Sequence, residues 1–384
     1  MKVCFSIVLH GAVYITATFA ADPNNCNTAN KERSGSDFTL KENADNTYLS
    51  GLASKLANRR ATVSQVLDSA NHALTSEPLT RPISAYMWEH TADFNDEATE
   101  KWVPQGLTST ADSLAVGTVE GRSAWLVSWH LEDNTSVRVT FVDQESKKYR
   151  HALLVNPVAG DTFKAVPVHA GGMAWYGNTL WVVDSSGGDG AVGFRVFDLS
   201  NIWTMDSGGD TVMGKSGSSY YAMGYKYVIP QIRSYTWNRS FNFQFSFVAL
   251  DRSTTPDSLL VGEYQVADAT APRRLARWDL DYTTRKLKTS AGIASASWAY
   301  CVDIDRMQGA VSNAGKVYIS RSNGDSNGDL WAWTPGNAAK NNAGFFPPSP
   351  EDLSWDTRTD TFYGLTEAKN KRYILTYKKS QVSV

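Results

Sequence analysis

The sequence almost entirely lacks net charge. Its 37 Lys and Arg residues oppose 39 Asp and Glu residues, which leaves a formal charge of −2. A nucleic-acid partner is therefore not expected, because such proteins present a concentrated basic face. Three active-site signatures are also missing: a Gly-x-Ser-x-Gly motif, zinc-ligand spacing and a phosphate-binding loop. These absences exclude several common enzyme classes.

Long apolar runs are confined to the N-terminus. Met1-Lys2, the apolar run 3–19 and Ala20-Ala21 predict a signal peptide over residues 1–20, with a membrane anchor as the alternative. No later segment is long enough to span a bilayer, so we expect a secreted, extracellular protein without a membrane partner.

Cysteine is equally scarce, at three residues. Cys4 leaves with the signal peptide, so Cys26 and Cys301 either form one disulfide or stay unpaired. Asn134 and Asn238 begin N-glycosylation sequons, which matter if the host is eukaryotic.

Three segments follow from the pattern of the chain. Residues 1–20 are the predicted signal peptide, and residues 21–78 form a polar extension with helical periodicity over 47–75. Residues 79–384 consist of strands and turns. The stretch 169–199 is the clearest example: three short strands, the first two joined at Gly177-Asn178, which is strong hairpin chemistry.

Related strand groups recur five times over residues 102–380. This repetition predicts an all-β chain folded as a single five-bladed β-propeller with a short N-terminal helical extension. Six blades is the alternative, if the long second or third unit contains a further one. The last unit lacks a fourth strand, and residues 79–90 could supply it and close the ring.

Polar residues occupy equivalent positions in these units. The second strands end on ionisable residues: His130, Asp184, Glu263, Arg321 and Glu367. The inner strands begin with Gln105, His169, Gln308 and Glu351, and with Gln244 or Ser246 in the third unit. These positions meet on one axial face of a propeller, so we expect a ligand site there. The alternative is that these groups bond to one another and fill the mouth of the channel.

This set of residues suits a carbohydrate or a similar polar ligand. In a glycan lyase, Arg321 would neutralise a uronate while His169 or His130 removes a proton. In a glycosidase, two of the four carboxyl groups Asp184, Glu263, Glu351 and Glu367 would act as acid and base. A non-catalytic lectin would instead need a stacking aromatic residue such as Trp129, Trp175 or Trp355. A secreted factor that binds protein through the propeller rim is a further alternative.

No cofactor is expected. The run from Asn323 to Asp329 matches the first half of a calcium loop, but Thr334 stands where a bidentate acid is needed, so a polar turn is favoured over calcium. No metal ligands are assigned. We expect a monomer.

Five stretches carry a resemblance: 102–108, 149–155, 168–177, 307–310 and 350–355. With them, residues 102–378 resemble a family of uncharacterised secreted β-propeller proteins of actinobacteria and filamentous fungi. The resemblance implies the propeller fold and transfers no catalytic residue. Fold alone does not decide function.

Overall fold

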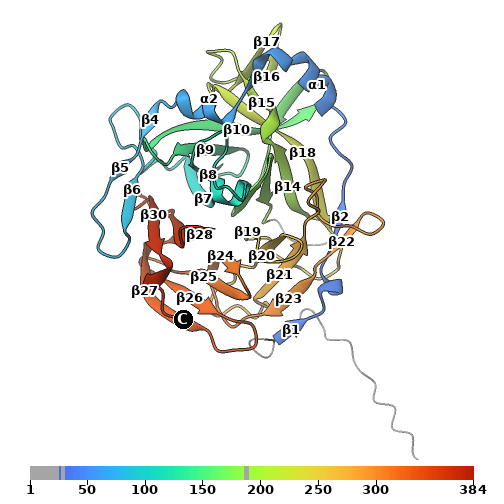
Figure 1. Ribbon diagram of the computed structural model, residues 1–384. Helices are drawn as coiled ribbons and strands as arrows, with labels where there is room; N and C mark the ends of the chain where they lie inside the picture. Colours follow the sequence, from blue (N-terminus) through green and yellow to red (C-terminus); the bar gives the residue numbers. More distant parts are fainter. Residues whose placement is uncertain (1–25, 27–30, 186–189) are drawn as a thin grey trace, which may run out of the picture.

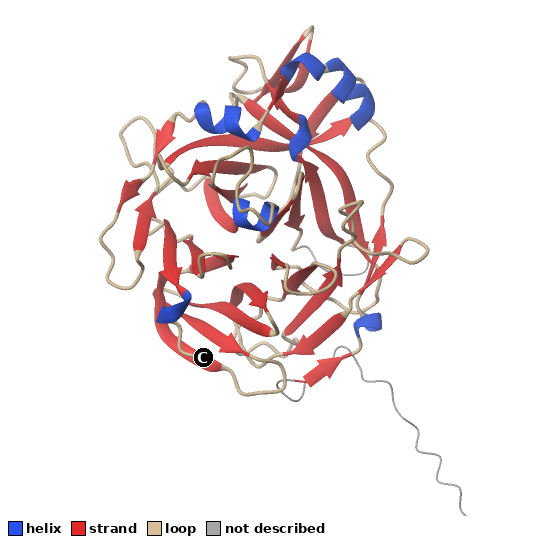
Figure 2. Cartoon of the chain, viewed as in Figure 1, coloured by secondary structure: helices blue, strands red, loops and turns tan. Residues whose placement is uncertain are grey.

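The computed structural model describes residue 26, residues 31–185 and residues 190–384. Figures 1 and 2 show sheets arranged around a central axis, with short helices at the periphery and one near the centre. The predicted all-β class is confirmed, and the arrangement is that of a propeller. The predicted signal peptide lies outside the described residues.

The first two repeat units each form a four-stranded antiparallel series. The first consists of β7 Trp102–Ser109, β8 Ala124–Leu131, β9 Val137–Asp143 and β10 Lys148–Val158. The second consists of β12 Met173–Tyr176, β13 Thr179–Val183, β14 Val192–Asp198 and β18 Tyr227–Trp237. Gly177, at the β12–β13 turn, has φ +61°, as the hairpin prediction required.

The remaining units form three separate sheets. The third unit contains β19 Phe247–Asp251, β20 Ser258–Gly262, β21 Arg274–Asp279, β23 Trp298–Cys301 and β1 Lys31–Arg33. The fourth contains β24 Met307–Asn313, β25 Lys316–Asn323, β26 Ser326–Trp333 and β27 Lys340–Pro348. The fifth contains β28 Pro350–Asp356, β29 Thr361–Thr366, β30 Tyr373–Lys378, β6 Ser84–Met87 and β5 Thr75–Ser76.

The N-terminal strand β6 closes the fifth sheet, as the sequence predicted. It pairs antiparallel with the C-terminal strand β30, with Ala85 opposite Leu375. Each innermost strand also contacts the next, so β7, β12, β19, β24 and β28 surround the axis. The strand β30 therefore has a hydrogen-bonded neighbour on both sides and is not a sheet edge.

One pairing interrupts the regular pattern of units. The outer strands β10 and β18 pair in parallel, with Leu153 opposite Val228, and this pairing merges the first two units into a 14-stranded sheet. Sequence analysis did not predict it. Because the two units share backbone hydrogen bonds, sheet connectivity alone does not define the number of blades.

The remaining elements are short strands and helices outside the four- and five-stranded units. The short strands are β2 Thr39–Glu42, β3 Arg60–Ala61, β4 His72–Ala73, β11 Thr162–Ala165, β15 Ile202–Thr204, β16 Met213–Ser216, β17 Ser219–Ala222 and β22 Ile293–Ser295. The helices are α1 Leu49–Lys55, α2 Val63–Asp68 and α3 Thr110–Ser113. The expected helices at 47–75 are thus α1 and α2, whereas β1 and β2 in the polar extension were not anticipated.

Glycines allow the inner strands to approach closely at the axis. A Cβ atom on Gly172 would lie 2.5 Å from the backbone nitrogen of Val248, and one on Gly309 would lie 2.6 Å from Cα of Asp352. No larger residue fits these positions without moving the backbone. Since Gln308 immediately precedes Gly309, this packing also holds the start of β24 at the axis.

A buried carboxyl group ties three inner strands together. Oδ2 of Asp352 accepts hydrogen bonds from the backbone N–H groups of Leu107 (3.1 Å) and Met173 (3.2 Å). Burial raises the pKa of Asp352 well above its ordinary value despite these bonds. The axis is therefore filled by polar contacts at this level.

Apolar side chains fill the spaces between neighbouring sheets. The β13 strand is buried throughout, because both of its faces are covered. Between the second and third sheets lies a cluster of aromatic rings that includes Trp181, Phe194, Tyr235, Phe245 and Trp278. These contacts set the angle between the sheets and so position the ends of their strands.

A disulfide joins Cys26 to Cys301 at the end of β23, confirming that alternative of the sequence analysis. Next to it, β1 pairs with the same strand, with Lys31 opposite Cys301. The N-terminal segment is thus attached to the third sheet. In the described part of the chain, no helix is long and apolar enough to cross a membrane.

Candidate axial binding site

A cavity of about 370 Å³ opens on one axial face. Five residues predicted from the sequence line it: Gln105, His130, His169, Gln308 and Glu367. Gln244 and Ser246, the two candidates of the third unit, line it as well, and Ser185 and Tyr264 are additions that the sequence analysis missed. The predicted convergence of strand ends thus brings these side chains together.

A chain of hydrogen bonds runs along the cavity wall. Nε2 of Gln105 donates to a carboxyl oxygen of Glu367 (2.6 Å), and its Oε1 accepts from Nε2 of His169 (3.0 Å). Nδ1 of His169 lies 3.2 Å from the side-chain amide of Asn134, on the exposed β8–β9 turn. The first and second units and the C-terminal unit therefore share one network.

Glu351 and Glu367 form a carboxyl pair at one end of this chain. They are hydrogen-bonded to each other, and Nε2 of Gln308 donates to Glu351 (2.9 Å). Burial raises the pKa of both groups, and that of Glu351 rises further because Glu367 is adjacent. A direct bond between two carboxyl groups requires a proton, so the pair is not doubly ionised.

Two histidines form the opposite end of the chain. The rings of His130 and His169 lie 4.2 Å apart. Burial lowers the pKa of both, to about 4 for His169, where His130 also contributes. Both rings are therefore neutral near pH 7. Nδ1 of His130 donates to the carbonyl of Leu131 (2.6 Å), which leaves its Nε2 as an acceptor.

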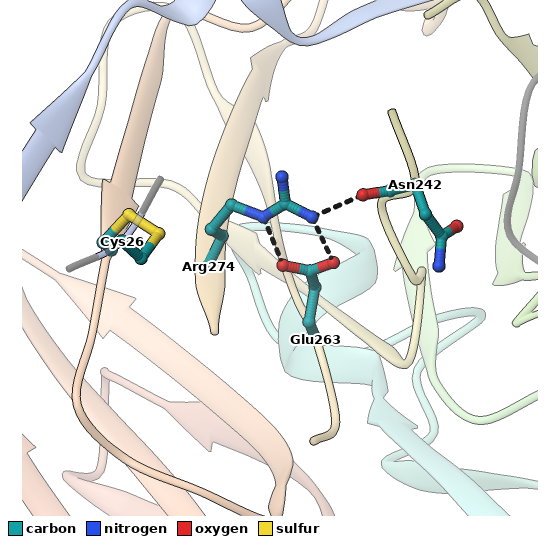
Figure 3. The surroundings of a disulfide bond; sticks show 5 residues. Cys26, Asn242, Glu263 and Arg274 are labelled. Carbon is teal, nitrogen blue, oxygen red and sulfur yellow. Dashed lines mark hydrogen bonds and ion pairs between the residues drawn. A yellow bond between two sulfur atoms is a disulfide. The ribbon is translucent and has the colours of Figure 1, made fainter. Parts of the chain in front are cut away.

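Four of the predicted site residues are not among those that line the cavity. Glu351 bonds to Gln308 and Glu367, and each of the other three forms an ion pair within its own unit. Asp184 pairs with Arg195 (3.0 Å) and Glu263 with Arg274 (2.6 Å), as Figure 3 shows for the second pair. Arg321 pairs with Asp305 (2.8 Å) and Asp329 (3.2 Å). These side chains hold the hairpins together and do not face the cavity.

The missed residues follow the predicted ones by one position. Ser185 comes directly after Asp184, and Tyr264 directly after Glu263. Successive side chains of an extended chain point to opposite faces. The predicted residue therefore points towards its ion-pair partner, and the residue after it points into the cavity. The sequence contained a signal for these ion pairs: an oppositely charged residue lies 11 residues after Asp184 and Glu263, and 8 residues after Arg321.

The aromatic residue of the site is Tyr264. The tryptophans suggested from the sequence lie elsewhere: Trp129 is fully buried against Trp88, and Trp175 lines a different cavity. Trp355 contacts Phe362 and Tyr318 inside the protein. The half-buried ring of Tyr264 offers an apolar surface beside the amides.

No lysine or arginine is among the described residues that line the cavity. Its polar groups are amides, hydroxyls, neutral imidazoles and the carboxyl group of Glu367, which is hydrogen-bonded to Glu351 behind it. Such groups exchange hydrogen bonds with hydroxyl groups in both directions. They offer nothing that would neutralise an anion.

Metal ligation finds no support in the described part of the chain, where no three His, Cys, Asp or Glu side chains are grouped to hold an ion. Asn323 to Ser326 form the β25–β26 hairpin turn, and the Asn323 side chain donates to the carbonyl of Asn327 (3.0 Å). The half-matching calcium loop begins at this hairpin turn.

No protein-family model matches the chain, and no curated protein matches it. Among solved structures, it is similar to the Cps50 (Swd1) beta-propeller domain of Myceliophteria thermophila, with 9% identity, a TM-score of 0.37, and coverage of 82% of this chain and 100% of that one. It is also similar to a chain of a nidogen/laminin complex, with 11% identity, a TM-score of 0.30, and coverage of 81% and 95%. At these scores neither likeness bears on the ligand.

Proposed function

We propose that this protein is a non-catalytic binding module whose axial cavity takes a neutral, hydroxyl-rich group, such as a terminal sugar residue. The observation that carries the proposal is the composition of the cavity: amides, hydroxyls and neutral imidazoles around one tyrosine ring, without a cation. Sites of this kind combine a few placed polar groups with an aromatic surface. An acidic sugar would leave its carboxylate without a partner.

Two features argue against cleavage of the bound sugar. Glu351 and Glu367 are directly hydrogen-bonded, whereas glycosidases place their two carboxyl groups about 5–9.5 Å apart. The lyase arrangement fails for a different reason: Arg321 is held by two aspartates away from the cavity. Neither catalytic set is assembled.

The wider biological setting belongs to the same proposal. We infer a secreted monomer of five blades, with a signal peptide over 1–20, an extension over 21–78 and the propeller over 79–384. The disulfide is consistent with an oxidising compartment, and the exposed positions of Asn134 and Asn238 with glycosylation. Family membership in the actinobacterial and fungal group remains a prediction.

A glycan panel tests the proposal. Binding of neutral oligosaccharides is measured by calorimetry for the wild type and for Gln308→Ala, with Gln144→Ala in the β9–β10 turn as the matched control. Losing the Gln308 amide should weaken binding about tenfold, the cost of about one hydrogen bond with its partner left unpaired. The control should bind as the wild type does.

The same panel is assayed for reducing ends and for ultraviolet absorbance of a new carbon–carbon double bond. We expect neither signal. A product that disappears in Glu367→Gln would contradict the non-catalytic proposal. If no glycan binds, a protein partner at the rim becomes the better hypothesis, and cavity variants should then leave its binding unchanged.

A further inference from the structure

A second cavity, of about 290 Å³, lies outside the first unit, and the residues that line it do not include any from the axial cavity. One side is formed by β4, β9 and β10, which contribute His72, Arg138, Arg150 and His151. The opposite side is the segment 205–226, an insertion between β15 and β18 that carries the β16–β17 hairpin. This insertion adds no strand to the main sheet series, yet it covers the outer strand β10.

The back of this outer cavity is rigid. Asp96 accepts hydrogen bonds from Arg138 (2.5 Å), His151 (2.9 Å) and the hydroxyl of Tyr149 (2.9 Å). The Arg138 guanidinium also lies between the rings of Trp102 and Trp129, 4.8 and 4.6 Å from their centroids. Its charge is therefore already balanced, and these groups form a fixed wall.

Arg150 differs from Arg138 in having no counter-ion. Its Nη1 donates to the carbonyl of Ser69 (3.2 Å), and among the described residues no carboxylate lies within ion-pair distance of its guanidinium. Burial lowers its pKa, because the half-buried cation loses water without gaining an opposite charge. Exposed Lys226 lines the same cavity over the ring of Tyr227, also without a carboxylate partner in the described chain.

An oriented imidazole stands beside these cations. Nδ1 of His72 lies 3.2 Å from Glu89, and its Nε2 accepts from the Asn71 amide (2.8 Å). The ring stacks on Phe94 at 3.6 Å. Phe94 and Met223 add apolar surface to the lining. The cavity thus combines an unbalanced guanidinium, hydrogen-bonding groups and an apolar wall.

We propose that this outer cavity binds a small organic carboxylate, with Arg150 as its counter-ion and the Phe94 side as the seat of its apolar part. A guanidinium matches a carboxylate with two parallel hydrogen bonds. A dianion fits less well, because Asp210 also lines the cavity and Glu89 lies behind His72. This proposal is independent of the axial site and does not require a sugar ligand.

The test uses benzoate as the probe and benzamide as its uncharged counterpart, with binding measured by calorimetry on the whole protein. Benzoate should bind and benzamide should not. Arg150→Gln should weaken benzoate binding by tenfold or more, since a hydrogen bond to a charged group is lost. Arg285→Gln, which removes an equal charge outside this cavity, should bind as the wild type does.

Folding of Arg150→Gln is checked by its thermal transition, and Lys226→Gln serves as a second variant at an exposed position. It should weaken benzoate binding by a smaller factor. The proposal is overturned if the wild type does not bind benzoate, if benzamide binds equally well, or if Arg150→Gln binds unchanged. Tighter binding of inorganic phosphate than of benzoate would also overturn it.

Discussion

The axial and outer cavities differ in the charge of their buried polar groups. No lysine or arginine is among the described residues that line the axial cavity, where burial raises the pKa of both carboxyl groups of the pair and lowers the pKa of both imidazoles. The outer wall instead keeps one buried ion pair, Asp96 with Arg138, while burial lowers the pKa of His151 to about 4 and leaves that imidazole neutral. The comparison teaches that burial favours the neutral form of a group unless its neighbours stabilise the charge by more than the loss of water costs.

The buried charge pair should give the largest effect. Asp96→Asn leaves Arg138 buried without its counter-ion, so the free energy of unfolding should fall by about 3–5 kcal/mol. Urea unfolding measures it. Asp206→Asn, which breaks a half-exposed pair with Arg59, should cost under about 1 kcal/mol. If both variants lost the same free energy of unfolding, the buried Asp96–Arg138 pair would be no more important for stability than the partly exposed Asp206–Arg59 pair, and the prediction would be wrong.

The neutral imidazoles should make the axial network sensitive to acid. A histidine whose pKa is lower in the folded state contributes stability above its unfolded pKa of 6.5, and this contribution is lost as pH falls towards about 4. For His169 the loss should be on the order of 2 kcal/mol. The free energy of unfolding of His169→Gln, measured by urea at several pH values, should therefore fall less steeply below pH 6.5 than that of the wild type.

Exposed His90→Gln serves as the control for this experiment, because His90 lies outside both cavities. The free energy of unfolding of this control should fall below pH 6.5 as steeply as that of the wild type. If His169→Gln keeps the full wild-type slope between pH 6.5 and 4, the axial imidazole is not held neutral by burial.

The carboxyl pair should give the smallest effect, and of opposite sign. Because the pKa of Glu351 is raised in the folded state, its stabilising contribution is present below its unfolded pKa and is lost as pH rises through the folded pKa. Glu351→Gln keeps the hydrogen-bonded shape without the titration. The substitution should leave stability nearly unchanged in acid and should stabilise the protein at higher pH, where the wild-type pair must lose its proton. Glu100→Gln, at an exposed position, is the control. If the free energy of unfolding of Glu351→Gln ran parallel to that of the wild type at all pH values, the two carboxyl groups would not share a proton.

Most of the fold could be predicted because it repeats. Strand groups recur along the chain, and their turns carry Gly and Asn where positive φ is needed. The stretch 169–199 was therefore assigned to three strands, which the structure contains as β12, β13 and β14. The closing role of residues 79–90, which contain β6, followed from the missing strand of the last unit. The β10–β18 pairing was not predictable, because two long outer strands reveal nothing in sequence about which neighbour they meet.

The candidate site was predicted in part, and the part missed has a clear cause. Gln105 and Gln308 precede glycines that the axis requires, so their position follows from packing. Asp184 and Glu263 were chosen one residue too early, where the chain faces its own hairpin partner. The outer cavity left no sequence signal, because His72, Arg150 and Lys226 come from distant segments without a shared spacing.

The sequence by itself determined the all-β class, the repeat, the ring closure and the set of polar strand ends, because periodicity and turn chemistry are local properties. The disulfide, which the sequence left open, was decided by the structure. Only the tertiary structure decided which of those polar groups face the axis and which pair within a sheet, since a shift of one residue reverses the direction of a side chain. It also decided which groups stay charged, because protonation depends on burial and neighbours that fold in from elsewhere in the chain.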